Sequence, residues 1–412
     1  MRRQRVAGVA ALAVGVGIAA AGAAAEQGQI HAGVHRVPAT ILQVIQGFDN
    51  PEGAIFSADG RHVFVSNAAE IGDRAPEFAW TEGAGYISKL RVLPSGRLEM
   101  IEERLVTDLT APLGMGVLPV GTDRFPAGTI FAATGSAPLR DGAGAVITDP
   151  QRLQTKLVAF TEEGEVLGEI AMGTGSVFEE IGGSPIVLLN ALGFDREGNV
   201  YAADTAFGGA QFEPPIEGKG GVWMVPVGAL DALAGGQRPP QQQRPRFLPV
   251  PGNPDGVEVS PADGRIYVNT VGPVNAAPDP ADGGIYALTR EGFTGDAAAG
   301  GELPPPVDGG LGALDGLDFT AGGAMLNTQI KGDVPALIYV NCPGQGATTL
   351  ELQPGGPAAE LSGPADLAVR RAADGPQLVV VPELMARDAS PGDDEVTVLA
   401  LPADFDEACG GS

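Results

Sequence analysis

Basic residues, histidines, cysteines and aromatic residues are all scarce in this sequence. Its 412 residues include 25 Lys and Arg against 51 Asp and Glu, only three His and two Cys, and 5% aromatic residues. The formal net charge of -26 repels nucleic acid and anionic membrane surfaces and favours cations. Because no basic patch with interleaved aromatic residues occurs, nucleic-acid binding is set aside. A solvated acidic surface accounts for most of the carboxylates.

Long apolar runs are also absent, except at the start of the chain. Three arginines among the first five residues precede an Ala/Val/Gly-rich run that ends in three alanines before Glu26. This order is typical of a secretory signal peptide, so residues 1–25 are predicted to be removed on export. The mature protein is then secreted or periplasmic and has no membrane segment. An uncleaved anchor is the alternative, because the run is just long enough to span a bilayer.

One short pattern recurs along the rest of the chain. Its clearest copy is Asn253 to Thr270, where two runs of alternating β-branched or aromatic residues flank the turn Asp263-Gly264, which is typical of a β-hairpin. Strand-rich repeats of about 40–60 residues indicate a β-propeller with one four-stranded blade per copy. One residue stands before the first strand of each copy, at intervals of 50 to 77 positions: Glu52, Leu113, Asn190, Asp255, Asp315 and Ala365.

The composition fits a turn-rich ring of sheets. With 62 Gly, 35 Pro and no long amphipathic helical pattern, the chain is predicted to be all-β, with only a short helical element at 228–234. We predict a six-bladed β-propeller over residues 39–403, after a loose segment at 26–38 and before a tail at 404–412. The last blade lacks one strand. The N-terminal strand Thr40 to Ile45 is expected to join it, which closes the ring and leaves no open edge.

Polar residues gather at one mouth of the predicted channel. All inner strands start on the same face as the long loops that join second to third strands, which marks this face as functional. Four starts carry an oxygen-bearing side chain. Three of these side chains are carboxylates, which repel one another unless a cation or protons intervene. Together with the amide they form an all-oxygen set of ligands, which favours Ca²⁺. The alternative is that these are turn residues bonded to local backbone. The four are Glu52, Asn190, Asp255 and Asp315.

A second polar layer is expected one strand further out, since each second strand ends in a polar residue. Asp204 is placed there to orient Asn190 or take a proton, or simply to bond backbone. Trp80 lies in the long loop 68–84, where it either walls an apolar substrate pocket or packs on its own blade. The predicted substrate pocket consists of Asn67, Trp80, Thr134, Asp204, Thr270 and Gln329.

These motifs resemble the metal set of the SMP-30/gluconolactonase family and the related paraoxonases. The likeness is carried by Glu52-Gly53, Asn190, Asp255-Gly256 and Asp315-Gly316. In that family, six-bladed propellers hold a catalytic divalent metal, usually Ca²⁺, with Glu, Asn, Asn and Asp. The resemblance therefore implies Ca²⁺-dependent hydrolysis of lactones or esters. It also implies Asp315 as both metal ligand and base. Strictosidine-synthase-like proteins share the fold without this chemistry.

The sequence departs from the family pattern in two respects. Asp255 stands where the family has its second Asn, which adds a negative charge and should tighten metal binding. The histidine pair of the paraoxonases has no counterpart, because His31 and His35 precede the propeller and His62 begins a second strand near the opposite face. A histidine-based mechanism is therefore disfavoured.

The resulting hypothesis is an exported, monomeric, Ca²⁺-dependent hydrolase of a small-molecule lactone or ester. The metal polarises the carbonyl, and a carboxylate takes the proton from water, with Asp315 first and Asp204 in reserve. The alternative is a non-catalytic propeller that binds a small molecule or a protein partner, with Ca²⁺ purely structural. Cys342 and Cys409 are expected to form a disulfide that ties the tail to the fifth blade, with two free thiols as the alternative.

The exported protein should begin at Glu26. N-terminal sequencing of the protein recovered outside the cytoplasm of a secreting host checks this cleavage site. Membrane-bound protein that still begins with Met1 would establish the uncleaved anchor instead.

Overall fold

The computed structural model describes most of the chain after residue 35. The described residues are 36–69, 79–272, 283–294, 303, 305–330, 337–342, 347–353, 361, 363–371, 376–384 and 394–409. The predicted signal peptide, and part of the loop that precedes Trp80, therefore lie outside the described residues. Within these ranges, no helix has the length and hydropathy needed to cross a bilayer.

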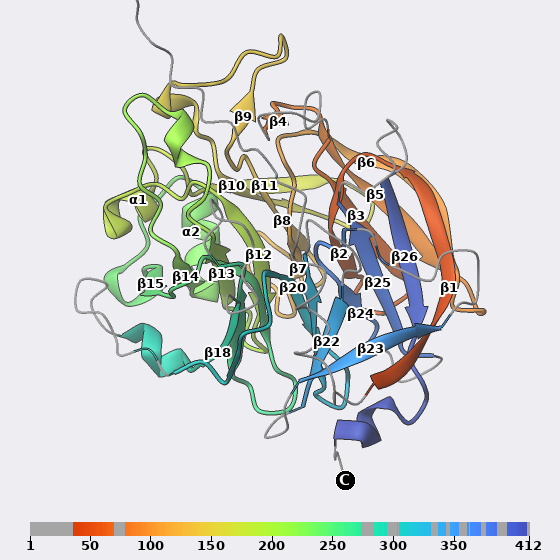
Figure 1. Cartoon of the computed structure of the whole chain (residues 1–412). Helices are drawn as coiled ribbons and strands as arrows, with labels where there is room; N and C mark the ends of the chain where they lie inside the picture. The colour runs from red at the N-terminus through yellow and green to blue at the C-terminus, as the bar shows by residue number, and fades with distance from the viewer. Residues whose placement is uncertain are drawn as a thin grey trace, which may run out of the picture.

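The described residues form four separate four-stranded sheets, one eight-stranded sheet and one two-stranded sheet (Figure 1). The first two sheets are β2 (Pro51–Phe56), β3 (His62–Asn67), β5 (Gly85–Val92) and β6 (Leu98–Leu109), and β7 (Met115–Val117), β8 (Ile130–Thr134), β10 (Lys156–Phe160) and β11 (Val166–Ala171). The next two are β12 (Leu189–Phe194), β13 (Val200–Asp204), β14 (Gly221–Val225) and β15 (Arg246–Pro249), and β16 (Pro254–Val259), β17 (Ile266–Thr270), β18 (Gly284–Leu288) and β19 (Asp308–Gly309).

The eight-stranded sheet joins the last two repeats through the N-terminal strand. Its order is β20-β21-β22-β23-β1-β26-β25-β24. The strands are β20 (Leu314–Phe319), β21 (Met325–Gln329), β22 (Leu337–Asn341), β23 (Thr348–Gln353), β1 (Arg36–Phe48), β26 (Asp394–Ala400), β25 (Leu378–Glu383) and β24 (Ala368–Val369).

The long strand β1 confirms one prediction and corrects another. It pairs antiparallel with β26, so the N-terminal strand does complete the last repeat, and the two ribbons run side by side in Figure 1. Its first residues also pair in parallel with β23, from Arg36 opposite Thr349 to Thr40 opposite Gln353. The prediction of six separate blades is wrong in this respect: four blades are separate sheets, and the remaining strands form one continuous sheet. The cause is the length of β1, because its 13 residues extend past β26 and reach β23.

The first strands of the repeats form the centre of the arrangement. Contacts link β2 to β7, β7 to β12, β12 to β16, β16 to β20, β20 to β24, and β24 back to β2. Apolar side chains fill the space between neighbouring sheets. For example, the rings of Phe64 on β3 and Phe160 on β10 meet edge to face, with centroids 6.4 Å apart. Each such buried side chain contributes about 1.5–3 kcal/mol to stability, so sheet-to-sheet packing holds this propeller-like ring of strands in place.

Short elements outside the sheets account for the remaining differences from prediction. The expected helix at 228–234 is present as α2 (Leu230–Ala234), but α1 (Val177–Gly182) was not predicted. Six residues are too few to show helical periodicity, and α1 depends on its caps, the Ser176 hydroxyl and Gly183 in the left-handed region. The outer strand β19 follows the proline run at 304–306. A parallel pair, β4 (Trp80–Thr81) and β9 (Leu139–Arg140), was also missed.

The C-terminal tail packs beside Cys342. Cys342 directly follows β22 and is buried in the same apolar cluster as Phe405, which begins the short 3-10 helix Phe405–Cys409. No free cysteine occurs among the described residues. The side chain of Cys409 lies outside them, so the bond between Cys342 and Cys409 stays a prediction.

Replacing one cysteine should destabilise the protein if that bond exists. Cys409→Ser is expected to lower the free energy of unfolding by about 2–4 kcal/mol, measured by denaturant titration without reductant. Reductant should lower the stability of the parent and leave the variant unchanged. Two reactive thiols in denatured, non-reduced parent protein would show that no bond forms.

Candidate functional site

Three predicted ring carboxylates come together at the head of the central strands. Glu52 on β2 and Asp255 on β16 are each 4% exposed, and Asp315 on β20 is 8% exposed. Their charges interact, since Asp255 and Asp315 raise the pKa of Glu52, and Asp315 raises that of Asp255. The structure therefore places these three carboxylates near enough to influence one another, and their role as metal ligands stays a prediction.

A glycine after each of these carboxylates allows the strands to approach closely. A Cβ added to Gly53 would lie 2.5 Å from the Leu113 carbonyl oxygen, and one added to Gly256 would lie 2.6 Å from that of Asp315. No larger residue fits there without moving backbone. The second strands support this approach, because the Gly256 N–H donates to Asn269 Oδ1 at 2.8 Å and the Gly53 N–H donates to the Ser66 hydroxyl at 2.7 Å.

Sequence analysis missed a fourth carboxylate, Asp366. Ala365 occupies the predicted ring position of the last repeat, but it carries no polar group and is fully buried. The next residue, Asp366, stands where four of the other five repeats have glycine. Its N–H donates to the Glu52 carbonyl at 3.1 Å. Asp366 raises the pKa values of Glu52 and Asp255. The missing glycine in Pro364-Ala365-Asp366 was the available signal. We call Glu52, Asp255, Asp315 and Asp366 the acid ring.

Burial makes the ionised form of the acid ring unfavourable. Desolvation is the main cause that raises the pKa values of Glu52, Asp255 and Asp366 well above their ordinary range, and neighbouring carboxylates raise them further. Desolvation raises the pKa of Asp315 to about 7. No cationic side chain is among the groups that shift these values. Glu52 Oε2 and Asp255 Oδ1 are buried without a hydrogen-bond partner in the described part of the chain.

The predicted amide ligand Asn190 also lies at the head of its strand, β12. Its carbonyl accepts the Gly114 N–H at 2.8 Å, in the manner of the Asp366–Glu52 contact. Its half-buried side chain makes no hydrogen bond to any described residue. The amide is therefore available as an uncharged oxygen donor beside the acid ring.

The oxygen donors at the acid ring fit a hard divalent cation, although the carboxylates alone are not enough to coordinate it. Orphaned carboxylate oxygens in a buried, uncompensated cluster are the donors that Ca²⁺ prefers. No three His, Cys, Asp or Glu side chains among the described residues are close enough together to hold a metal ion by themselves. A cation here would therefore also need amide or carbonyl oxygens, and Asn190 is placed to supply one.

Most of the predicted substrate-pocket residues are used inside their own sheets. Asn67 accepts the Asp49 N–H at 3.1 Å and donates to the Ser88 hydroxyl at 3.0 Å. Thr270 accepts the Gly284 N–H at 2.9 Å. Gln329 donates to the Leu311 carbonyl, and Thr134 is fully buried. Asn67, Thr270 and Gln329 thus hold strands and loops together, whereas the Thr134 hydroxyl is buried without a hydrogen-bond partner among the described residues. All four side chains are 5% exposed or less.

Asp204 and Trp80 are also placed away from the acid ring's open oxygens. Asp204 accepts the Ala206 N–H at 3.1 Å, and burial raises its pKa to about 7 without a contribution from the acid ring. Trp80 is 3% exposed and packs in a cluster with Leu113, Leu139 and Phe212. In Figure 1 its strand β4 and the partner β9 lie at the top, beyond the sheets. Trp80 therefore belongs to an apolar cover over this face.

Comparison with known proteins shows likenesses of fold at low identity. No protein-family model and no curated protein matches the sequence. Solved structures with a similar arrangement include a gluconolactonase from Xanthomonas campestris, with 12% identity, 90% of this chain and 96% of that chain covered, and a TM-score of 0.46. A PQQ-bound aldose sugar dehydrogenase from Streptomyces coelicolor has 14% identity, 88% and 98% coverage and a TM-score of 0.48. The allergen Mala s 1 from Malassezia sympodialis has 10% identity, 87% and 94% coverage and a TM-score of 0.44. At these scores none of the three assigns a function to this chain.

The acid ring should make metal-free protein less stable as pH rises. The folded state holds protons that the unfolded chain releases near pH 4, and Asp315 releases its proton only at about 7. In chelator, the melting temperature should therefore fall between about pH 4.5 and 7. Asp255→Asn removes one of the carboxylates and should flatten this fall. Glu163→Gln, an exposed control that removes the same charge, should not. A melting temperature that rises across this range in the parent would contradict the assignment.

Proposed function

We propose that the protein is an exported hydrolase of lactones or esters that binds a divalent cation, Ca²⁺ in the first instance, at the acid ring. The observation that supports this most directly is the set of buried carboxylates with unpaired oxygens and no cationic side chain among the groups that shift their pKa values. Such a cluster favours uptake of a cation or of protons. Glu52, Asn190, Asp255 and Asp315 would hold the cation.

The relation to the gluconolactonase family is part of this proposal. It depends on Glu52-Gly53, Asn190, Asp255-Gly256 and Asp315-Gly316, and on counting the eight-stranded sheet as two blades joined by β1. That count gives six repeats around the channel, one for each first strand.

The residues of this chain would divide the work between binding and proton transfer. A bound divalent cation supplies polarisation of a substrate carbonyl. Glu52 and Asp255 place two negative charges beside that position. Asp315 would take the proton from the attacking water. Its pKa of about 7 describes the metal-free site, and a bound cation would lower it and keep the carboxylate ionised as a base requires. Asp204, which bonds to its own turn, remains a reserve base only.

The remaining parts of the proposal concern partners and location. The substrate is a small molecule, and the protein acts as a monomer outside the cytoplasm after signal cleavage. The acidic composition, with 51 Asp and Glu, favours neutral or cationic substrates over anionic ones in their approach.

One observation favours the alternative, a non-catalytic binding propeller with a structural cation. The second-strand residues that were predicted to contact substrate bond within their own sheets, and Trp80 is part of an apolar cover. A protein of this kind would bind Ca²⁺ and gain stability from it, but it would hydrolyse neither lactones nor aryl esters.

A lactone and aryl-ester panel, assayed with Ca²⁺ and with chelator, separates the two functions. We expect hydrolysis only with Ca²⁺, and a stabilisation of about 3–4 kcal/mol at 100–1,000 times the dissociation constant. Asp315→Asn should lose activity by about 100-fold or more and keep much of the Ca²⁺-dependent stability. Glu52→Gln should need more Ca²⁺ for the same rate, while Glu163→Gln should match the parent. Calorimetry without Ca²⁺ binding would refute the metal site, and full activity of Asp315→Asn at saturating Ca²⁺ would refute the base.

A further inference from the structure

A cavity of about 790 Å³ opens at the other mouth of the channel. It lies among the turns that join first to second strands, such as Asp59-Gly60 and Asp263-Gly264, so it faces away from the acid ring. None of the four acid-ring residues lines it. The cavity therefore belongs to a different site from the one described above.

The cavity has two chemically different walls. Ile55 on β2, Val117 on β7 and Phe194 on β12 line it with partly accessible apolar side chains. Glu258 on β16, Asp318 on β20 and Arg371 after β24 line the side formed by the last three repeats. Such a cavity suits a ligand that has an apolar body and one polar group.

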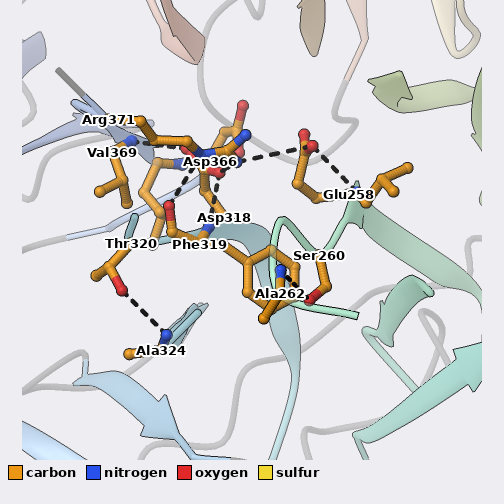
Figure 2. Close-up of polar contacts among 12 residues, drawn as sticks. Glu258, Ser260, Ala262, Asp318, Phe319, Thr320, Ala324, Asp366, Val369 and Arg371 are labelled. Atoms are coloured by element: carbon orange, nitrogen blue, oxygen red, sulfur yellow. Dashed lines mark hydrogen bonds and ion pairs between the residues drawn. The ribbon is translucent and has the colours of Figure 1, made fainter. Parts of the chain in front are cut away.

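Asp318 and Arg371, on the charged wall, are engaged in hydrogen bonds and ion pairs with neighbouring residues, as Figure 2 shows. Asp318 accepts the Phe319 N–H at 2.6 Å and the Val369 N–H at 2.7 Å, and it pairs with the Arg371 guanidinium. Arg371 Nε also donates to the Phe319 carbonyl at 3.0 Å. Arg371 is thereby directed toward Asp318 and is 3.7 Å from Glu258 Oε1.

Glu258 is the residue of this charged wall that can still accept a hydrogen bond from a ligand. Its side chain is 15% exposed, and both of its contacts use Oε1, with the Val259 N–H at 3.0 Å and with Arg371. Oε2 accepts no geometrically defined hydrogen bond from any residue that the structure describes. Burial raises the pKa of Glu258 to about 7, and Asp318 raises it further, although Arg371 lowers it. The guanidinium that Glu258 shares with Asp318 therefore does not fully compensate the charge of this carboxylate.

The sign of the charge decides which polar group a ligand should carry. Acidic side chains outnumber basic ones around the cavity: Asp59, Asp195, Glu197, Glu258, Asp263 and Asp318 against Arg196, Arg290 and Arg371. A carboxylate ligand would meet this negative field and compete with Asp318 for Arg371. An ammonium group would instead supply the missing positive charge and a hydrogen-bond donor for Oε2.

We propose that this cavity is a binding site for a small organic amine. The ammonium group donates to Glu258 Oε2, and the apolar body packs against Ile55, Val117 and Phe194. The proposal is independent of the acid ring and of any hydrolytic activity.

Calorimetry with three probes of similar apolar body tests the site: 2-phenylethylamine, 2-phenylethanol and 3-phenylpropionate. The amine should bind at least 10-fold more tightly than the alcohol, and the carboxylate should bind least. Glu258→Gln should weaken amine binding at least 10-fold, while Glu163→Gln, which removes one charge at a distant exposed position, should not. Val117→Phe, which adds bulk to the apolar wall, gives a second test that leaves Glu258 intact.

Competition with Ca²⁺ distinguishes this cavity from the acid ring. Amine affinity should be the same in chelator and in excess Ca²⁺ once ionic strength is matched. If Ca²⁺ displaces the amine and Glu258→Gln has no effect, the amine occupies the acid ring and the proposal is wrong. It is equally wrong if 3-phenylpropionate binds as tightly as the amine, or if no probe binds to correctly folded parent protein.

Discussion

The close approach of the first strands around the channel is the constraint on which the other features depend. Glycines follow four of the six ring positions because neighbouring backbone leaves no room for a Cβ, as at Gly53 and Gly256. This approach crowds carboxylates that lie at the strand heads and removes them from water. The crowding in turn makes protons or a cation necessary there, so the electrostatics of the site follow from backbone packing.

The buried carboxylates at the two mouths of the channel differ in whether a cationic side chain accompanies them. At one mouth the acid ring has no cationic partner among the groups that shift its pKa values, whereas at the other an arginine lies between two carboxylates. Asp366 connects the two, since both Asp315 and Asp318 raise its pKa. The sequence signals differ as well. The first mouth has a repeated motif, while the second depends on Arg371, which has no counterpart at equivalent positions of the other repeats except Arg196.

Repetition determined how much of this structure could be predicted from the sequence. A pattern that recurs in each repeat predicts the hairpins, the starts of the inner strands and the positions of Glu52, Asp255 and Asp315. The pairing of β1 with β26 was predicted because the last repeat lacked one strand. Features that occur once were missed, including the parallel pairing of β1 with β23, the capped helix α1 and Asp366. The second-strand polar residues were placed on the correct strands, but their hydrogen bonds to neighbouring strands depend on side-chain direction, which alternation alone does not give.

The strand β1 makes completion of the fold a late event. It lies near the start of the chain, yet its partner β26 is more than 300 residues away, and its other partner β23 is nearly as distant. Contacts of such sequence separation form slowly, because a long loop must close before they stabilise anything. Until β23 and β26 are available, β1 exposes unpaired backbone groups. A nascent chain is therefore most vulnerable to mispairing with other chains at this seam, and the same seam is where a truncated chain would fail to close.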